Sequence, residues 1–192
     1  MVPKTWICQG EQRYLVKGNY TSYGQEPVNE WLASRLCELL GFDYCPYAVI
    51  KRRTSLISVC PGFVADNEEI ITADQIVASE QKANDVSEYE HYIRILEDHG
   101  IENARQHMEE MFITDYLLMN TDRHLRNFGV IRKVETLEWG RTVPVFDTGQ
   151  SMFCGVPTDR LPYKNVTGKL FSNTSKDFET YPRLIRTLQT ID

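Results

Sequence analysis

The residues with the clearest chemical potential lie between Asn120 and Gly149. This stretch contains Asn-Thr-Asp-Arg-His-Leu-Arg-Asn-Phe-Gly and, after a candidate β-hairpin, Val-Pro-Val-Phe-Asp-Thr-Gly. Phosphoryl transfer needs an acceptor hydroxyl held in line and one or two Mg²⁺ ions between the phosphates, with little covalent help from the protein. Asp122, Asn127 and Asp147 have side chains suited to these tasks.

The spacing from Asp122 to Asn127 is weak evidence by itself. The same spacing occurs twice more, at positions 98 and 103 and at positions 115 and 120. Neither of these pairs precedes a candidate strand, because Asp98 lies in a turn between helical stretches and Asp115 lies inside an apolar helical pattern. We therefore expect both to be ordinary structural residues.

The residues after Asn127 predict a β-hairpin that brings Asn127 to Asp147. Extended runs over 128–131 and 142–146 flank a polar turn centred near Leu137. In an antiparallel pair, this centre places Asn127 opposite Asp147, with the α-carbons about 5 Å apart. An Asn amide oxygen and an Asp carboxylate are hard ligands that suit Mg²⁺.

The string Asp-Arg-His-Leu-Arg-Asn, together with the later Asp-Thr-Gly, resembles the catalytic segment of HipA-like kinases. These are bacterial serine/threonine kinases on a fold related to protein kinases and phosphatidylinositol kinases. The string is also similar to the catalytic loop of phosphatidylinositol 3- and 4-kinases. The resemblance implies that Asp122 is the catalytic base and that Asn127 and Asp147 ligate Mg²⁺. It also makes His124 a candidate base, so the choice between Asp122 and His124 stays open.

Each of these residues also has an ordinary structural explanation. Asp122 and His124 could form a solvated ion pair in a helix C-terminal turn. Asn127 could hold its own backbone in a turn, and Asp147 could cap a turn through Thr148 and Gly149.

Upstream, a lysine and a glutamate form a second candidate pair. Apolar patterning over 6–8 and 13–17 predicts two strands, the second ending at Lys17. A helix is predicted from about Glu26 to Leu40, with Glu30 near the boundary of its apolar face. From the residues alone, Lys17 is a solvated lysine and Glu30 a first-turn acid favoured by the helix dipole. The resemblance instead makes them the pair that holds the lysine over the nucleotide phosphates. The expected apolar face of the helix consists of Val28, Trp31, Leu32, Leu36, Leu39 and Leu40.

Further strands and helices follow this helix. Runs over 47–51 and 56–59 predict two strands, and the resemblance places Cys60 and Phe63 against the adenine where two lobes join. The remaining predicted helices cover 72–78, 86–97 and about 102–119. In the last of these, the apolar stripe consists of Ala104, Met108, Met111, Phe112 and Tyr116, widened by Ile113, Leu117 and Met119.

The predicted elements indicate an α+β protein, and the resemblance implies a protein-kinase-like bilobal fold. Residues 1–63 would form a small antiparallel β lobe with one long helix. Residues 64–192 would form a larger, mainly helical lobe that carries the catalytic loop (120–129), the metal-binding Asp147 and truncated C-terminal helices.

The composition is that of a folded cytoplasmic domain. Of the 192 residues, 42% are hydrophobic and 25% charged, and no apolar stretch is long enough for a signal peptide or a membrane span. Five cysteines without a Cys-x-x-Cys pair predict reduced thiols. A net charge of −6 argues against direct contact with a nucleic-acid backbone.

Three features depart from the family pattern. No glycine-rich phosphate-covering loop precedes Lys17, since Gly10 fits a hairpin turn. Thr148 replaces the usual phenylalanine after Asp147, so a packing switch based on that ring cannot operate. Residues 176–192 predict a helix that stops without a partner, and the resemblance implies that N- and C-terminal parts of the family are missing.

The resemblance implies an ATP- and Mg²⁺-dependent kinase that phosphorylates Ser or Thr hydroxyls on a protein, with an antitoxin-like protein as a candidate partner. A lipid or small-molecule hydroxyl is an alternative acceptor, because lipid kinases share the Asp-Arg-His string. A catalytically inert module that binds a nucleotide or a protein partner is a third interpretation, favoured by the missing loop.

Overall fold

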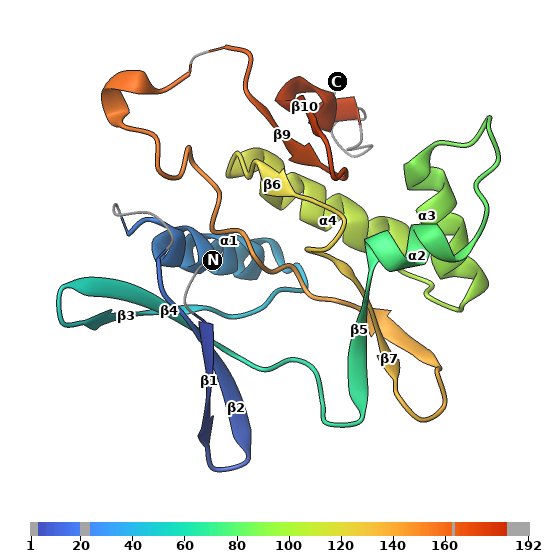
Figure 1. Ribbon diagram of the computed structural model, residues 1–192, viewed down its shortest axis with the longest axis horizontal. Coiled ribbons are helices and arrows are strands. Elements are labelled where there is room, and N and C mark those ends of the chain that lie inside the picture. Colours follow the sequence, from blue (N-terminus) through green and yellow to red (C-terminus); the bar gives the residue numbers. More distant parts are fainter. Residues whose placement is uncertain (1–3, 20–23, 163, 184–192) are drawn as a thin grey trace.

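The computed structural model describes residues 4–19, 24–162 and 164–183. Within these residues, ten strands form three sheets and are accompanied by four α-helices. Figure 1 shows the four-stranded sheet and α1 on one side of the molecule, α2 and α3 on the other, and α4 running between them.

The first sheet is antiparallel and has the strand order β1-β2-β4-β3. Its strands are β1 (Lys4–Gln9), β2 (Gln12–Lys17), β3 (Ala48–Arg52) and β4 (Ser55–Pro61), in agreement with the four predicted runs. Lys17 ends β2 between Lys4 on one neighbouring strand and Ser58 on the other. It is only 5% exposed, so it is not a solvated lysine.

Helix α1 spans Glu26–Leu40, with Pro27 in its first turn and Gly41 in a left-handed conformation after its end, as predicted. The prediction of its buried face was wrong. Leu39 is 83% exposed and Trp31 is 42% exposed. The helix packs on β3 and β4 through small and polar side chains, because these make the hydrogen bonds of the site described below. The buried residues of α1 are Glu26, Pro27, Asn29, Glu30, Ala33, Ser34 and Cys37.

Three further helices build the main hydrophobic core. They are α2 (Ala73–Ser79), α3 (Glu88–Asp98) and α4 (Ala104–Leu117), each close to its predicted range. Thr72 begins α2 with a capping box, in which its hydroxyl accepts from the N–H of Gln75. The predicted stripe of α4 is buried or partly buried, but Leu117 is 56% exposed and does not belong to the core.

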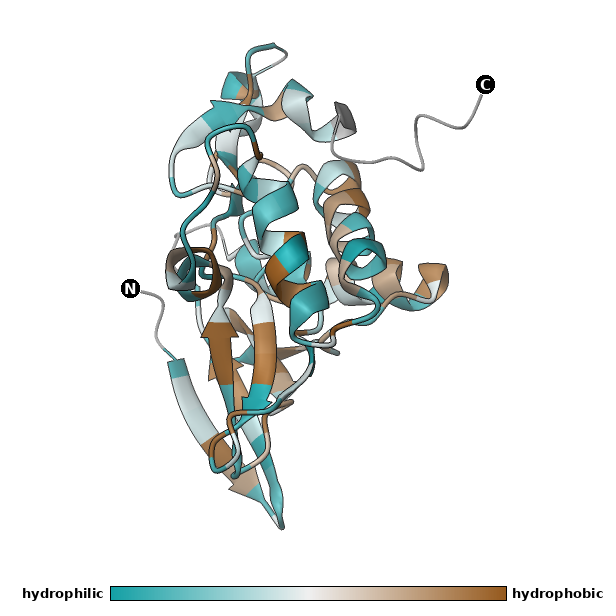
Figure 2. Ribbon diagram, turned by 90° about the vertical axis from the view of Figure 1, so that its right-hand side faces the viewer, coloured by the Kyte–Doolittle hydropathy of each residue, from teal (hydrophilic) through white to brown (hydrophobic). Residues whose placement is uncertain are grey.

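The second sheet has the order β5-β7-β8, with β5 (Glu68–Thr72), β7 (Gly129–Lys133) and β8 (Trp139–Thr142). Strand β5 was not predicted. Figure 2 shows hydrophobic residues gathered in the middle of β5 and β7, where Ile70 pairs with Ile131. The expected hairpin is present as β7 and β8, but its register was predicted wrongly. Val130 pairs with Thr142, and a bulge follows Ile131, so the ladder does not place Asn127 opposite Asp147.

The third sheet joins the segment that contains Asp122 to the C-terminal part of the chain. Strand β6 (Asp122–Arg123) is parallel to β9 (Thr167–Leu170), which is antiparallel to β10 (Ser175–Asp177). The prediction of a helix beginning at Lys176 was wrong for the described residues, because a 3₁₀ helix begins only at Phe178. Residues 184–192 of that prediction lie outside the described residues. The part of the chain predicted as a mainly helical lobe thus also contains two small sheets.

No helix in the described ranges is both long enough and apolar enough to cross a membrane.

Candidate functional site

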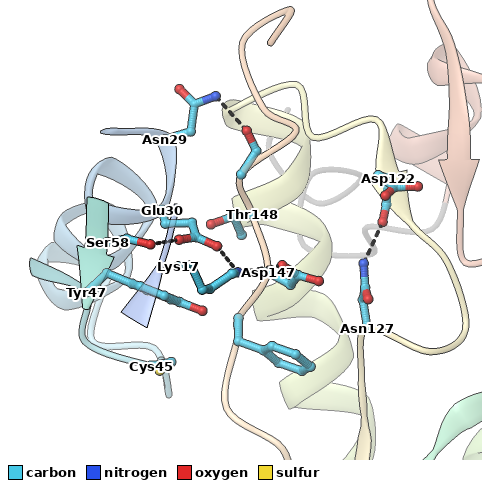
Figure 3. A network of polar contacts seen from close by, with 12 residues as sticks. Lys17, Asn29, Glu30, Cys45, Tyr47, Ser58, Asp122, Asn127, Asp147 and Thr148 are labelled. Atoms are coloured by element: carbon cyan, nitrogen blue, oxygen red, sulfur yellow. Dashed lines mark hydrogen bonds and ion pairs between the residues drawn. The ribbon is translucent and has the colours of Figure 1, made fainter. Parts of the chain in front are cut away.

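Lys17 lies at the centre of a buried ionic cluster. Its ammonium contacts the Glu30 carboxylate and, at 2.7 Å, Oδ1 of Asp147. Figure 3 shows these three side chains converging from β2, from α1 and from the segment after β8. Burial opposes the charge on Lys17, but the carboxylates of Asp147 and Glu30 outweigh it and raise the lysine pKa above its ordinary value. Lys17 is therefore a fully charged group at this position.

Helix α1 contributes other contacts to the site besides the ion pair of Glu30 with Lys17. Glu30 also accepts a hydrogen bond from the Ser58 hydroxyl, which ties the helix to β4. Nδ2 of Asn29 donates to the carbonyl oxygens of Gly149 at 2.9 Å and Ser151 at 2.7 Å. The polar face of α1 thus holds both the lysine strand and the segment that follows Asp147. These contacts explain why this face is buried.

Arg123 joins the backbone at Asn127 to the residue before Asp147. Its guanidinium is fully buried and forms a bidentate ion pair with Asp115 at 2.8 and 2.9 Å. One guanidinium nitrogen, Nη1, also donates to the carbonyl oxygens of Asn127 at 2.9 Å and Phe146 at 2.8 Å. Beyond the end of the β7–β8 ladder, the two backbone segments are therefore held together by this shared donor.

Asp115 is the anchor of this arrangement. Besides Arg123, its carboxylate accepts hydrogen bonds from Nδ2 of Asn120 at 2.7 Å and from the hydroxyl of Tyr181 at 3.1 Å. Burial opposes the charge on Arg123, but the charge of Asp115 outweighs it and raises the pKa of the guanidinium further above its ordinary value. Asp115 was expected to be an ordinary structural residue, and its role is structural, as the buried partner of Arg123, Asn120 and Tyr181.

The catalytic-loop candidates form their own contacts. Asp122 lies in strand β6 and not in a helix C-terminal turn. Nδ2 of Asn127 donates to the carbonyl oxygen of Asp122 at 2.9 Å, which leaves its Oδ1 for another partner. Nε2 of His124 lies 3.9 Å from Oδ2 of Asp122, and Nδ1 of His124 accepts from the N–H of Arg126 at 3.2 Å. Burial lowers the pKa of His124, so its neutral form is favoured.

Asp147 adopts a backbone conformation that non-glycine residues rarely populate, with φ of 55°. Burial opposes its negative charge, but the attraction of Lys17 holds its pKa below the ordinary value. Within the described residues, no cluster of three or more His, Cys, Asp or Glu side chains could hold a metal ion. A cation at this position would therefore rely on Asp147 and the Asn127 amide, together with water or ligand oxygens.

Two cavities meet at Lys17 and Asp147. One, of about 350 Å³, has a mainly apolar lining that includes Cys60, Phe63 and Phe146. The other, of about 140 Å³, is lined by charged groups, including Glu30, Asp122, Asp147 and Lys17. Lys4 at the start of β1 also lines both. The structure thus brings the predicted site residues to one cleft, except that Asn127 and His124 lie beside it and not in its lining.

Sequence reasoning missed Arg123, Asp115, Asn29 and Lys4. Arg123 was visible inside the Asp-Arg-His string, and its buried partner could have been sought among acidic residues in apolar helices. Asn29 stands beside Glu30 on α1, but no local pattern links it to the carbonyl oxygens more than a hundred residues later.

Comparisons with known proteins identify a family and a shared fold. The family model for the HipA-like C-terminal domain matches residues 1–182. No curated protein matches the sequence. Among solved structures, the proinflammatory kinase CtkA of Helicobacter pylori is similar, with a TM-score of 0.62, 19% identity, and coverage of 79% of this chain and 56% of that chain.

A chain from the Shewanella oneidensis MR-1 toxin–antitoxin complex of HipA, HipB and operator DNA is also similar. Its TM-score is 0.55 at 14% identity, and the match covers 77% of this chain and 42% of that chain. At such identities these likenesses show a shared kinase-like fold. The chain described here spans about half the length of these two structures.

Proposed function

Because the chain belongs to the HipA-like C-terminal domain family, we propose that it is an ATP- and Mg²⁺-dependent phosphotransferase that phosphorylates Ser or Thr hydroxyls on a protein. The observation that carries this proposal is the pair of cavities that meet at Lys17 and Asp147. A nucleotide has an apolar base at one end and charged phosphates at the other, and the cleft has the same polarity. Cys60 and Phe63 would meet the adenine, and Lys17 would meet the phosphates.

The proposed domain organisation follows from this placement of the nucleotide. Residues 1–63, with the four-stranded sheet and α1, would act as the small lobe, and residues 64–192 as the large lobe. The ion pair of Lys17 with Glu30 joins strand and helix within the small lobe, and its contact with Asp147 reaches the large lobe.

The residues fit a magnesium ion bound together with the phosphates. Oδ1 of Asp147 accepts from Lys17, so its second oxygen is left for a cation, and Oδ1 of Asn127 is left in the same way. Mg²⁺ takes few protein groups and keeps several waters, which suits one carboxylate and one amide. When bound, the ion would neutralise charge between the phosphates.

Asp122 is the better candidate for the base. Because Nδ1 of His124 accepts a backbone N–H, the proton of its neutral imidazole is assigned to Nε2, the nitrogen nearer to Asp122. A protonated nitrogen can donate but cannot accept a proton. Nε2 of His124 would thus present a proton and not a lone pair, so Asp122→Asn should lose about 10²-fold or more in transfer rate, whereas His124→Gln should lose less.

Transfer of labelled phosphate from ATP to the chain itself, to cell-extract protein or to extracted lipid tests the proposal. We expect label in protein with Mg²⁺, loss of transfer in Asp147→Asn, and normal transfer in Asp159→Asn, whose carboxylate is exposed in the segment after Pro157. Label found in lipid and not in protein would make the chain a lipid kinase.

An inert binding module is the second candidate function. Strands β1 and β2 are joined by a tight turn at Gly10 and Glu11, so no extended loop covers phosphates at this point. Mg-ATP at about a hundred times its Kd should stabilise the chain by about 2.7 kcal/mol if the site forms. A stabilisation of this size in thermal melting, without any phosphate transfer, would support the inert module.

The proposal also includes a protein partner and a location in the cytoplasm. The Shewanella structure is described as a complex of HipA and HipB, and an antitoxin-like protein is accordingly our proposed partner for this chain. Co-purification from bacterial cells would identify such a partner and the compartment.

A further inference from the structure

Strand β9 places a lysine beside the proposed base. Lys169 pairs with Asp122 across the parallel strands β9 and β6, and its backbone N–H donates to the carbonyl oxygen of Thr121 at 2.9 Å. Gly168 permits this close approach, because a Cβ atom there would lie 2.6 Å from the Thr121 carbonyl oxygen. Residues almost fifty positions apart are thus held in one register.

The side chain of Lys169 points to the reacting end of Asp122. Its Nζ lies 3.4 Å from Oδ1 of Asp122, and the two side chains are 45% and 37% exposed. An ion pair this exposed contributes little to stability. The ammonium can therefore leave the carboxylate when a stronger anion arrives nearby.

The charges around the cleft indicate a role for the ammonium of Lys169. The smaller cavity is lined by four carboxylates, those of Glu26, Glu30, Asp122 and Asp147, and by two lysines, Lys4 and Lys17, of which Lys17 already contacts two of the carboxylates. A phosphoryl group moving toward Asp122 would approach negative charge. Lys169 does not line this cavity itself, but it contacts Asp122, which does.

We propose that Lys169 is a catalytic residue whose ammonium contacts the phosphoryl group in transit. This inference rests on the phosphotransferase function proposed above. In the transfer, the acceptor oxygen forms a bond to the γ-phosphorus of ATP and the bond from that phosphorus to the bridging oxygen breaks, which releases ADP. The hydroxyl proton passes to Asp122. Lys169 neutralises charge on the phosphoryl oxygens and takes no proton.

Three variants of the 192-residue chain test this role. Lys169→Met removes the charge, Lys169→Arg keeps it, and Lys176→Met is the matched control, since Lys176 is exposed on the adjacent strand β10. For each variant, the melting temperature with and without Mg-ATP reports folding and binding. Labelled transfer to the chain itself and to dephosphorylated casein reports the rate.

We expect Lys169→Met to fold, to bind Mg-ATP within about threefold of the wild type, and to transfer phosphate about 10²-fold more slowly. Lys169→Arg should recover most of the rate, and Lys176→Met should match the wild type. Full activity of Lys169→Met, a failure of Lys169→Arg to restore the rate, or equal losses of folding and rate would overturn the inference and leave the kinase proposal standing. A wild-type chain that binds Mg-ATP without transfer would overturn both.

Discussion

Removal of the buried guanidinium of Arg123 is expected to cost both stability and nucleotide binding. Arg123→Met leaves Asp115 with two neutral donors, Asn120 and Tyr181, and leaves two backbone carbonyl groups without their shared donor. Breaking a buried ion pair by removing one partner costs about 3–5 kcal/mol. For a chain of this size, the melting temperature should fall by roughly 10 °C.

A double-mutant cycle separates the ion pair from other effects. Asp115→Leu should cost about as much as Arg123→Met, because it leaves an uncompensated buried charge. The double variant has no buried charge at this position but leaves the partners of both side chains unpaired, so it should lose about as much as either single variant, which corresponds to a coupling of about 3–5 kcal/mol. Arg94→Met is the control, since Arg94 is half exposed in its pairs with Glu80 and Asp98 and should cost less than about 1 kcal/mol.

Urea unfolding measures these stabilities, and the melting shift with Mg-ATP measures the site. We expect the shift to shrink in Arg123→Met, because Asn127 and the residue before Asp147 lose their common donor. Additive single-variant costs, or a loss for Arg123→Met no larger than that for Arg94→Met, would refute the view that this buried pair holds the site together.

Three further predictions concern the surrounding fold. Burial lowers the pKa of His107 to about 4, so between about pH 6.5 and pH 4 the unfolded chain binds a proton that the folded chain does not. The free energy of unfolding, measured with urea, should therefore fall by about 3 kcal/mol as the pH is lowered through this range. His107→Gln should lack this pH dependence. Gly129→Ala should lower the free energy of unfolding by about 3 kcal/mol, because a Cβ at this position would lie 2.0 Å from the Ile71 carbonyl oxygen. A Cβ at Gly140 would lie 3.5 Å from its nearest atom, so urea unfolding of Gly140→Ala should show little loss of stability. Leu39→Lys should change the melting temperature negligibly, because Leu39 is exposed; a large loss would mean that the apolar side of α1 is buried after all.

Elements with strong local signals were predictable from sequence. Pro27 and Gly41 mark the two ends of α1, and its observed bounds match the predicted ones. Thr72 marks the start of α2 through its capping box. These signals involve atoms within a few residues of each other, so they act in the same way whatever the rest of the chain does.

Pairings between distant segments were not predictable in this way. Strand β6 has two residues and β9 has four, which is too short for an alternating pattern to be recognised. The register of β7 and β8 depends on a bulge after Ile131, and a count from the turn cannot detect an extra residue. Asn127 and Asp147 were expected to face each other across the ladder, whereas Arg123 joins the backbone at Asn127 to that at Phe146 beyond the end of the ladder.

The inverted face of α1 has the same physical origin as the site. A periodicity argument assigns apolar side chains to the interior, because burial of apolar surface is the usual driving force. In α1 the interior is a site that needs a charged lysine held in place, and a buried ammonium requires a carboxylate partner such as Glu30, which in turn accepts a hydrogen bond from Ser58. The polar residues on the buried face of α1 thus mark the site in the sequence. Asn29 beside Glu30 is a part of this pattern that an analysis of hydropathy alone does not detect.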